Sequence, residues 1–238
     1  MTDYGQFCPV AKATELLGEK WMLLIIRELF LGTHRYNDFQ RALSRISPTL
    51  LTKRLRQLEK AGVIVKKLPQ GRRSHEYFLT PAGKELEPIV GQLASWGMRW
   101  AQSQLSDDEL DVEFLMWDIR RRLQTDYLPD GETVLCFIFD GLPQFDQWWL
   151  VVRDGEVDLC TENPGKDVDL YLRTTLRKLV EVWKGDLEIK MAIRNEVIKT
   201  QGNKTIEKSI SDWLGICLYA DIRPGDVEMM KRAADDSP

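Results

Sequence analysis

The apolar and polar positions of the first hundred residues follow the periods of several helices and of one hairpin. Apolar residues recur at helical spacing, and prolines or capping residues precede these segments while glycines follow them. Two short strand-like runs then flank a turn at residues 69–74. We predict helices at 10–17, 20–31, 36–43 and 48–61, strands at 63–68 and 75–79, and a long helix over 81–104 that Pro88 and Gly91 kink.

The helix predicted over 48–61 has two chemically different sides. Ser47 is a preferred N-cap residue, and Pro48 suits the first helical position. The positions at i, i+4 and i+7 are expected to face the core, and they are Leu51, Leu55 and Leu58. The residues that project from another side are Thr49, Thr52, Lys53 and Arg56. This helix is therefore expected to present hydroxyl and basic groups to solvent.

The second half of the chain follows a different pattern. The polar, acidic segment 103–111 indicates a domain boundary, and a helix is predicted over 109–126. Beyond it the pattern predicts strands at 133–139, 148–153, 157–161, 168–173 and 197–201 and helices at 175–184, 186–195 and 204–214. Helices beside a mainly antiparallel sheet make an α+β fold. We expect a domain at 1–104, a connecting helix and linker at 105–129, an α+β domain at 130–222 and a flexible tail at 223–238.

Charge divides the chain near the same place. Residues 1–102 carry 16 Lys and Arg against nine Asp and Glu, a net charge of +7, whereas residues 103–238 carry 17 against 28, a net charge of −11. The segment 35–73 alone contains 11 basic residues and two acidic ones. Solvated faces usually mix the two signs, so this pattern favours a polyanionic partner for the first domain.

These features together predict a winged helix-turn-helix domain that binds double-stranded DNA. Helix 48–61 is the expected recognition helix, because threonines reach base edges or phosphates and arginine bonds guanine through two parallel hydrogen bonds. One arginine starts the preceding helix and two lie at the hairpin tip, where a wing meets the DNA backbone or minor groove. The expected DNA contacts are Arg35, Ser47, Thr49, Thr52, Lys53, Arg56, Arg72 and Arg73.

Six segments of this domain closely resemble one family of bacterial regulators, the HxlR-type family. They are residues 8–10 (CPV), 16–21 (LLGEKW), 35–39 (RYNDF), 46–51 (ISPTLL), 55–62 (LRQLEKAG) and 77–83 (YFLTPAG), and the resemblance extends over about residues 7–102. It implies a homodimer in which the first and last helices of the domain pack across a two-fold axis. It also implies that the residues proposed above lie on the recognition helix, at the start of the preceding helix and on the wing.

Two features of these outer helices have alternative interpretations. Cys8 is either a small packing residue at the dimer contact, which we prefer, or a redox-sensing thiol as in some members of the family. Lys12, four residues on, would favour its thiolate. An apolar stripe on the last helix is interpreted as a dimer seam rather than a cradle for a ligand, and it consists of Ile89, Leu93, Trp96 and Trp100.

Four segments of the second half resemble the sterol-carrier-protein fold. They are residues 149–155 (WLVVRDG), 167–172 (DVDLYL), 182–186 (VWKGD) and 199–202 (KTQG). The resemblance implies an apolar tunnel between sheet and helices that holds a lipid-like or aromatic molecule. The candidates to line it are Trp148, Trp149, Trp183, Met191 and Trp213, although for each of them we prefer the interpretation as an ordinary core residue.

The sequence thus predicts a homodimeric transcription regulator that an apolar small molecule controls through the second domain. One alternative is a carrier of such a molecule in which DNA binding is secondary. Another is a thiol-based redox-sensing regulator that acts through Cys8.

Other classes of protein lack support in the sequence. The four cysteines are widely spaced and only two histidines occur, so neither a metal site nor a disulfide framework is expected. Motifs of hydrolases, metalloproteases and nucleotide-binding enzymes are missing, so we expect neither an enzyme nor a cofactor. The longest apolar run, residues 21–31, is too short to cross a bilayer, and the first residues do not resemble a signal peptide. We therefore expect a cytoplasmic protein without membrane contact.

Overall fold

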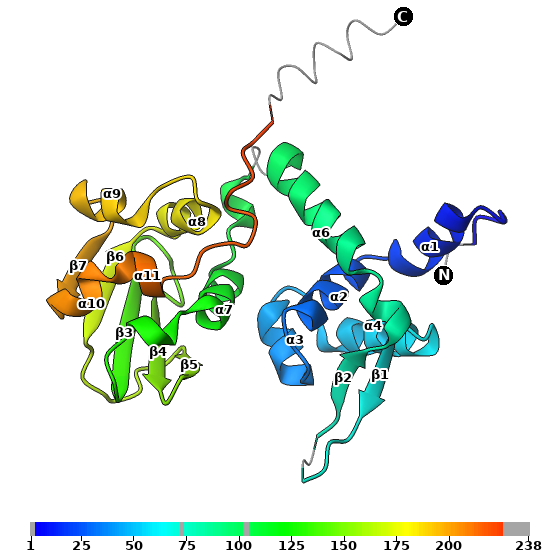
Figure 1. Ribbon diagram of the computed structural model, residues 1–238, viewed down its shortest axis with the longest axis horizontal. Coiled ribbons are helices and arrows are strands. Elements are labelled where there is room, and N and C mark those ends of the chain that lie inside the picture. Colours follow the sequence, from blue (N-terminus) through cyan, green and yellow to red (C-terminus); the bar gives the residue numbers. More distant parts are fainter. Residues whose placement is uncertain (1–2, 72–73, 102–104, 226–238) are drawn as a thin grey trace, which may run out of the picture. The chain divides into compact units, whose positions relative to one another are not determined.

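The computed structural model describes residues 3–71, 74–101 and 105–225 (Figure 1). The chain divides into two compact units, residues 1–94 and 95–238. Each unit has its own apolar core. Within the described residues no helix combines the length and the apolar character that a membrane-spanning helix needs.

The first unit is a helix-turn-helix region with a hairpin wing. Its helices are α1 (Pro9–Leu17), α2 (Met22–Phe30), α3 (Tyr36–Ala42), α4 (Pro48–Lys60), α5 (Pro81–Lys84) and α6 (Glu87–Trp96), whose last two residues belong to the second unit. The wing consists of β1 (Ile64–Lys67) and β2 (Glu76–Leu79), which pair antiparallel. Buried apolar residues of α2, α3 and α4 form its core together with Val63 and Ile64. The predicted winged-helix-like region within a mixed α and β chain is confirmed.

Local signals around α4 produce the predicted helix. The side chain of Ser47 accepts a hydrogen bond from the Leu50 N–H at 3.3 Å. Gly62 follows the helix with a φ of +74°, a conformation that glycine adopts without strain. The three apolar positions of the inward side are fully buried, and they are Leu51, Leu55 and Leu58. The predicted amphipathic helix is therefore present with its apolar side in the core.

The single long helix predicted over 81–104 is wrong. α5 ends at Lys84, α6 begins at Glu87, and the chain continues as one π-helical turn, η1 (Gly97–Ala101). The break precedes Pro88, which has no N–H to donate to the Lys84 carbonyl. The expected kink is thus a full interruption between two helices. The last three residues of the predicted helix lie outside the described part of the chain.

The second unit is built on one five-stranded sheet. Its strands are β3 (Glu132–Phe139), β4 (Gln147–Arg153), β5 (Glu156–Cys160), β6 (Leu170–Thr174) and β7 (Lys199–Gly202). They lie in the order β5-β4-β3-β6-β7, and every neighbouring pair is antiparallel except β3 and β6. The chain therefore crosses from the edge strand β5 to β6 past two strands, through the coil of residues 161–169.

The helices of the second unit are α7 (Val112–Arg122), α8 (Leu176–Lys184), α9 (Ile189–Arg194), α10 (Lys204–Lys208) and α11 (Ile210–Trp213), with short turns η3 (Asp107–Glu109) and η4 (Thr125–Tyr127). Three of the predicted helices were too long, namely 109–126, 186–195 and 204–214. α7 starts later because Asp111 caps it, accepting a hydrogen bond from the Phe114 N–H at 2.9 Å. Helix 204–214 is split at Ser209, whose hydroxyl donates to the Thr205 carbonyl at 3.3 Å.

The two faces of the sheet bury different clusters of side chains. Residues of the helices pack on one face against alternate strand residues, among them Trp148, Leu150 and Val152 of β4. The other face carries a smaller buried cluster, which consists of Val134, Cys136, Trp149 and Val151. Successive side chains of a strand point to opposite faces, so neighbouring residues of β4 belong to different clusters.

Residues 215–225, which we call the strap, lead from α11 to the π-helical turn η1. The Cys217 N–H donates to the Trp183 carbonyl at 2.8 Å, and the Gly225 N–H donates to the Arg99 carbonyl at 2.7 Å. A Cβ on Gly225 would lie 2.2 Å from the Trp100 ring, so only glycine fits there. Gly225 belongs to the segment predicted to be a flexible tail, of which residues 226–238 lie outside the described residues.

Candidate nucleic-acid interface

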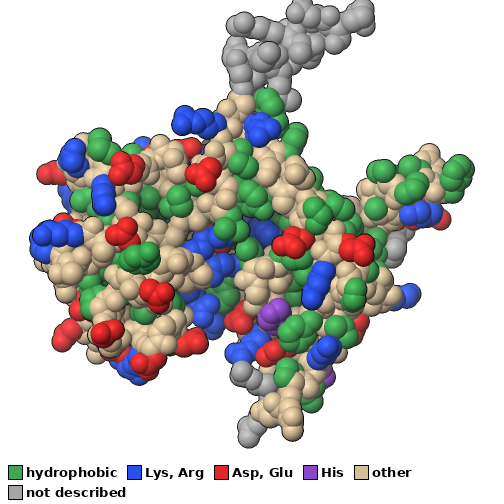
Figure 2. All heavy atoms as spheres, in the orientation of Figure 1, with side chains coloured by type: hydrophobic (Ala, Val, Ile, Leu, Met, Phe, Trp, Pro, Cys, Tyr) green, Lys and Arg blue, Asp and Glu red, His purple; other side chains and the backbone are tan. Residues whose placement is uncertain are grey.

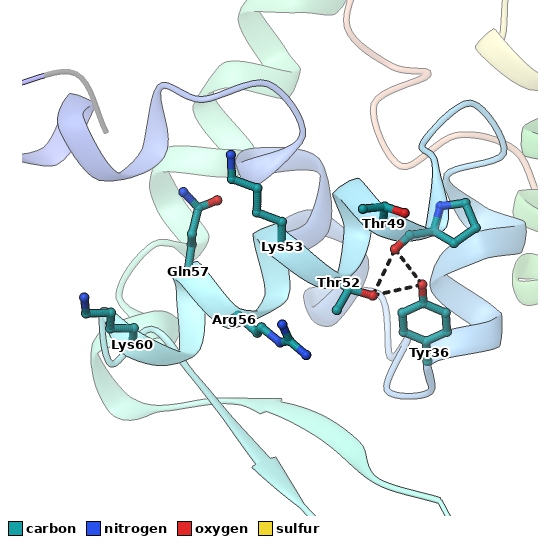
Figure 3. Close-up of a pocket in the computed structure, with 8 residues that line it drawn as sticks. Tyr36, Thr49, Thr52, Lys53, Arg56, Gln57 and Lys60 are labelled. Carbon is teal, nitrogen blue, oxygen red and sulfur yellow. Dashed lines mark hydrogen bonds between the residues drawn. The ribbon is translucent and has the colours of Figure 1, made fainter.

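A groove runs along the solvent side of α4 and reaches the first residue of α3 (Figure 3). Its volume is about 610 Å³. The residues that line it are Tyr36, Pro48, Thr49, Thr52, Lys53, Arg56, Gln57 and Lys60. Three of these side chains are cationic and none is acidic. The groove therefore suits an anionic partner that also offers hydrogen-bonding edges.

The structure brings four of the predicted DNA contacts together in this groove, namely Thr49, Thr52, Lys53 and Arg56. Figure 3 shows Lys53 and Arg56 on opposite edges of α4. Ser47 is not among the lining residues, because its side chain accepts a hydrogen bond from the Leu50 N–H and caps the helix. Its place in the structure is therefore that of a cap.

Tyr36 is a lining residue that the sequence analysis missed. Its hydroxyl donates to the Pro48 carbonyl at 2.8 Å and lies 3.2 Å from the Thr52 hydroxyl, which is itself 2.9 Å from the same carbonyl (Figure 3). Two hydroxyl protons serve these three contacts. The triangle joins the first turn of α3 to the first turn of α4, and the sequence separation of 12 to 16 residues left no local signal for it.

Gln57 and Lys60 were also missed, although the sequence contained a signal for them. Lys53, Gln57 and Lys60 follow one another at i, i+4 and i+7, which places them on one face of a helix. The prediction considered only the hydroxyl and basic residues of the first two turns. The lining of the groove thus continues to the last turn of α4.

Arg35 lies at the base of the wing and is paired there with Glu76. Its Nε donates to Glu76 Oε1 at 3.3 Å, and the two residues form an antiparallel bridge. The Tyr77 N–H donates to the His34 carbonyl at 2.9 Å, and the His34 ring stacks on Phe78. The segment before α3 therefore pairs with β2 through a single β-bridge. The predicted wing-tip contacts, Arg72 and Arg73, lie outside the described residues.

Apolar side chains are exposed on α1 and α6. Phe7, just before α1, is 98% exposed, and Figure 2 shows hydrophobic side chains gathered over this helix. On α6, Ile89, Leu93 and Trp96 are 49, 48 and 57% exposed. Trp100, the fourth residue of the predicted seam, is partly covered by Gly225. Exposed apolar patches of this kind mark surfaces that associate with another protein or a ligand.

The four cysteines have different environments. Cys8 is exposed at the N-cap of α1, but Lys12 Nζ is bonded to Glu15 Oε2 at 2.9 Å and lies 3.5 Å from Asp3 Oδ1. The ammonium group expected to favour the Cys8 thiolate is therefore engaged by two carboxylates. Burial raises the pKa of the Cys136 thiol to about 11, which makes it a packing residue at neutral pH.

The residues predicted to line a ligand cavity are separated by the structure. Trp148 and Trp213 are buried on the helix-covered face of the sheet, whereas Trp149 is buried on the opposite face. Met191 is 40% exposed, and Trp183 is partly buried beside the helix-covered cluster. These five side chains do not share one face of the second unit. Adjacent residues of a strand point to opposite sides of the sheet, so Trp148 and Trp149 cannot line the same cavity on one face.

Asp118 is a buried carboxylate that the sequence analysis did not single out. Its Oδ2 accepts hydrogen bonds from Trp183 Nε1 at 2.7 Å and from Arg122 Nε at 2.6 Å. The i, i+4 spacing of Asp118 and Arg122 was visible in the sequence, whereas the contact with α8 spans 65 residues. This carboxylate joins α7 to α8 inside the second unit.

Comparison with known proteins relates the first part of the chain to transcription regulators. A family model described as HxlR-like helix-turn-helix matches residues 16–105. The chain is 34% identical over 107 residues to the HTH-type transcriptional regulator YvaP of Bacillus subtilis, a match that covers 44% of this chain and 99% of that protein. It is 37% identical to the HTH-type transcriptional regulator sll1512 of Synechocystis, with 43% of this chain and 76% of that protein covered.

A solved structure, the redox regulator HypR in its reduced form, shares 35% sequence identity with the chain. The match covers 38% of this chain and 90% of that chain, with a TM-score of 0.36.

Proposed function

Because this chain belongs to the HxlR-like helix-turn-helix family, we propose that it is a DNA-binding transcriptional regulator that acts as a homodimer. Both curated relatives bear the name of HTH-type transcriptional regulators, which agrees with a role other than catalysis. The observation that carries the proposal is the groove along α4, whose lining is cationic and hydroxyl-bearing and contains no carboxylate.

In the proposed complex α4 enters the major groove of double-stranded DNA. Arg56 bonds a guanine edge, and Thr49 and Thr52 lie against neighbouring base edges or phosphates. Lys53 and Lys60 at the margin of the groove neutralise phosphates. Further backbone contacts are assigned to Arg35, which would have to exchange Glu76 for a phosphate, and to the wing residues Arg72 and Arg73.

The proposed homodimer uses the exposed apolar surfaces of α1 and α6. Phe7 and Val10 are the most exposed apolar residues near the first helix, and Ile89, Leu93 and Trp96 form the stripe on the second. A second copy of the chain would cover both. Two recognition helices related by a two-fold axis then read an inverted repeat with half-site centres about 34–36 Å apart or a multiple of that.

For residues 130–222 we propose a sterol-carrier-like domain that binds an apolar small molecule, joined to the DNA-binding domain at 1–104 by the connector at 105–129. A sheet that packs helices against one face, over a buried apolar core, supports the proposal. The strap supports a route for control, because within the second unit it contacts η1, which follows α6 along the chain. A ligand alters DNA affinity only by its different affinity for the two states of the protein.

Selection of bound DNA from a random pool tests the regulator proposal, with and without small apolar molecules extracted from cells. We expect enrichment of an inverted repeat, and a changed preference at one position of each half-site for Arg56→Ala. Arg41→Ala is the matched control, since Arg41 is an exposed arginine of α3 outside the groove. A pool that shows no enrichment, or identical preferences for wild type and Arg56→Ala, contradicts the proposal.

A further inference from the structure

Arg54 is a buried charged residue in the middle of α4. It is 8% exposed, because it lies three residues after Leu51 and four before Leu58 on the inward side of the helix. Its Nε donates to the Lys20 carbonyl at 3.0 Å, and its Nη1 donates to Gln57 Oε1 at 2.8 Å. The same Nη1 forms an ion pair with Glu19 Oε2. One guanidinium group therefore engages three acceptors.

Two of these acceptors belong to the tight turn between α1 and α2. Glu19 and Lys20 immediately precede Trp21, whose φ of +82° is unusual for a bulky side chain. The ammonium group of Lys20 lies 5.4 Å from the centre of the Trp21 ring, and Trp21 packs against the core of the first unit. Arg54 thus connects the recognition helix to a turn of defined conformation some 34 residues earlier in the chain.

Stability alone does not account for this ion pair, in which Arg54 is buried and Glu19 is partly buried. Removing charges from water opposes the attraction between them, and apolar residues of similar volume often stabilise a protein equally well or better. The planar guanidinium, however, has a fixed direction for each hydrogen bond. Rotation of α4 about its own axis would break the bonds to Lys20 and Glu19 together, and it would redirect Lys53 and Arg56 by the same angle.

We propose that Arg54 is a positioning residue for DNA recognition. Together with Glu19 it holds α4 at the rotation that directs Lys53 and Arg56 toward DNA, and it orients the Gln57 amide at the margin of the groove. This inference rests on the proposed function as a DNA-binding regulator. It assigns no direct DNA contact to Arg54, whose burial keeps it from phosphates.

The test replaces the ion pair by apolar residues in the full-length protein, as Glu19→Leu with Arg54→Met. We expect the thermal unfolding temperature to stay the same or rise, whereas the ratio of affinities for selected DNA and unrelated DNA falls about tenfold or more, as for the loss of a base contact. The dependence of affinity on salt should not change, because the number of phosphate contacts is unchanged. A folded double variant with the wild-type affinity ratio overturns the proposal.

Two further variants keep the test decisive. Arg54→Lys replaces the double variant if that variant does not fold. It retains the charge but lacks the planar guanidinium that engages three acceptors, so it should also lower the ratio of affinities for selected and unrelated DNA. Lys53→Met is the matched control on the exposed side of α4, and it should weaken binding to all DNA and reduce the salt dependence. If Arg54→Lys lowers the unfolding temperature and both affinities equally, the role of Arg54 is structural only. If wild-type protein prefers no DNA sequence, the proposed function itself fails.

Discussion

α4 and α6 both begin at proline-containing segments, yet they leave opposite chemistry exposed. α4 buries three of its four leucines in the core and presents Lys53, Arg56 and Lys60 to solvent. α6 buries none of its residues and presents Ile89, Leu93 and Trp96. A helix whose apolar side is already covered needs a partner only for its charges, whereas an uncovered apolar side needs a second protein surface. The comparison thus predicts two partners, DNA for α4 and another copy of the chain for α6.

The largest effect is expected when charges replace the apolar stripe of α6. Leu93→Asp with Trp96→Asp should give monomers, because two carboxylates would be buried in the seam. Affinity for the inverted repeat should fall about 100-fold or more, since each half-site is then bound separately. Sedimentation and DNA titration measure the two consequences.

Tyr127→Asp is the control for this prediction, since Tyr127 is an exposed aromatic residue of η4 in the second unit. It should leave the protein dimeric with unchanged DNA affinity. If the variant with both replacements on α6 remains dimeric, the apolar stripe of α6 is not the dimer contact, and the predicted difference between the partners of α4 and α6 is wrong.

The second prediction compares the two sides of α4. Leu55→Ala removes a fully buried side chain and should lower the free energy of unfolding of the first unit by about 2–5 kcal/mol. Lys53→Ala on the exposed side should change it by no more than about 0.5 kcal/mol. Hydrogen exchange of the α4 amides measures both values. Equal losses for the two variants would mean that Lys53 is part of the core.

The third prediction concerns the far end of α6, where η1 meets the strap. Gly225→Val places a side chain against the Trp100 ring and should destabilise this contact by about 1–3 kcal/mol, as overpacking does. Exchange of the Gly225 amide, which is bonded to the Arg99 carbonyl, should become faster. Gly97→Ala in the same turn meets open space and is the control. Unchanged exchange in Gly225→Val would show that the strap does not depend on this contact.

The smallest effect is expected from pH. Burial raises the pKa of the Cys136 thiol from an ordinary value of 9.0 to about 11, so the unfolded chain loses this proton at lower pH than the folded chain. Stability of the second unit should therefore fall as pH rises from about 9 to 11, because the unfolded state then binds fewer protons. Cys136→Ala should abolish this part of the pH dependence. In native protein an alkylating reagent should modify the exposed Cys8 well before Cys136.

The start and end of α4 could be predicted because their causes are local. Ser47, Pro48 and Gly62 act through hydrogen bonds and backbone angles within three residues of each helix end. Pro88 carried an equally local signal. We predicted a kink within one helix, whereas the helix is interrupted between α5 and α6. The prediction misjudged only how strongly the proline disrupts the helix, since the missing N–H of Pro88 was already visible in the sequence.

Arg54 shows what could not be predicted. In the sequence it is one of 11 basic residues between positions 35 and 73. Its spacing from Leu51 and Leu58 places it on the apolar side of the helix, but no local pattern indicates the partners that it meets there. In the structure it is buried against Glu19 and Lys20, because chain folding brings the α1–α2 turn to the inward side of α4. The role proposed for Arg54 therefore depends on the tertiary structure.

By itself the sequence determined the winged helix-turn-helix region and the basic, hydroxyl-bearing side of α4, because caps, periodicity and charge act over a few residues. Tertiary structure decided the strand order β5-β4-β3-β6-β7, the separation of Trp149 from Trp213, the pairing of Arg35 with Glu76 and the burial of Arg54. Each of these depends on which distant segments meet when the apolar surfaces are removed from water. That choice is made by packing of the whole unit, which no local pattern of residues specifies.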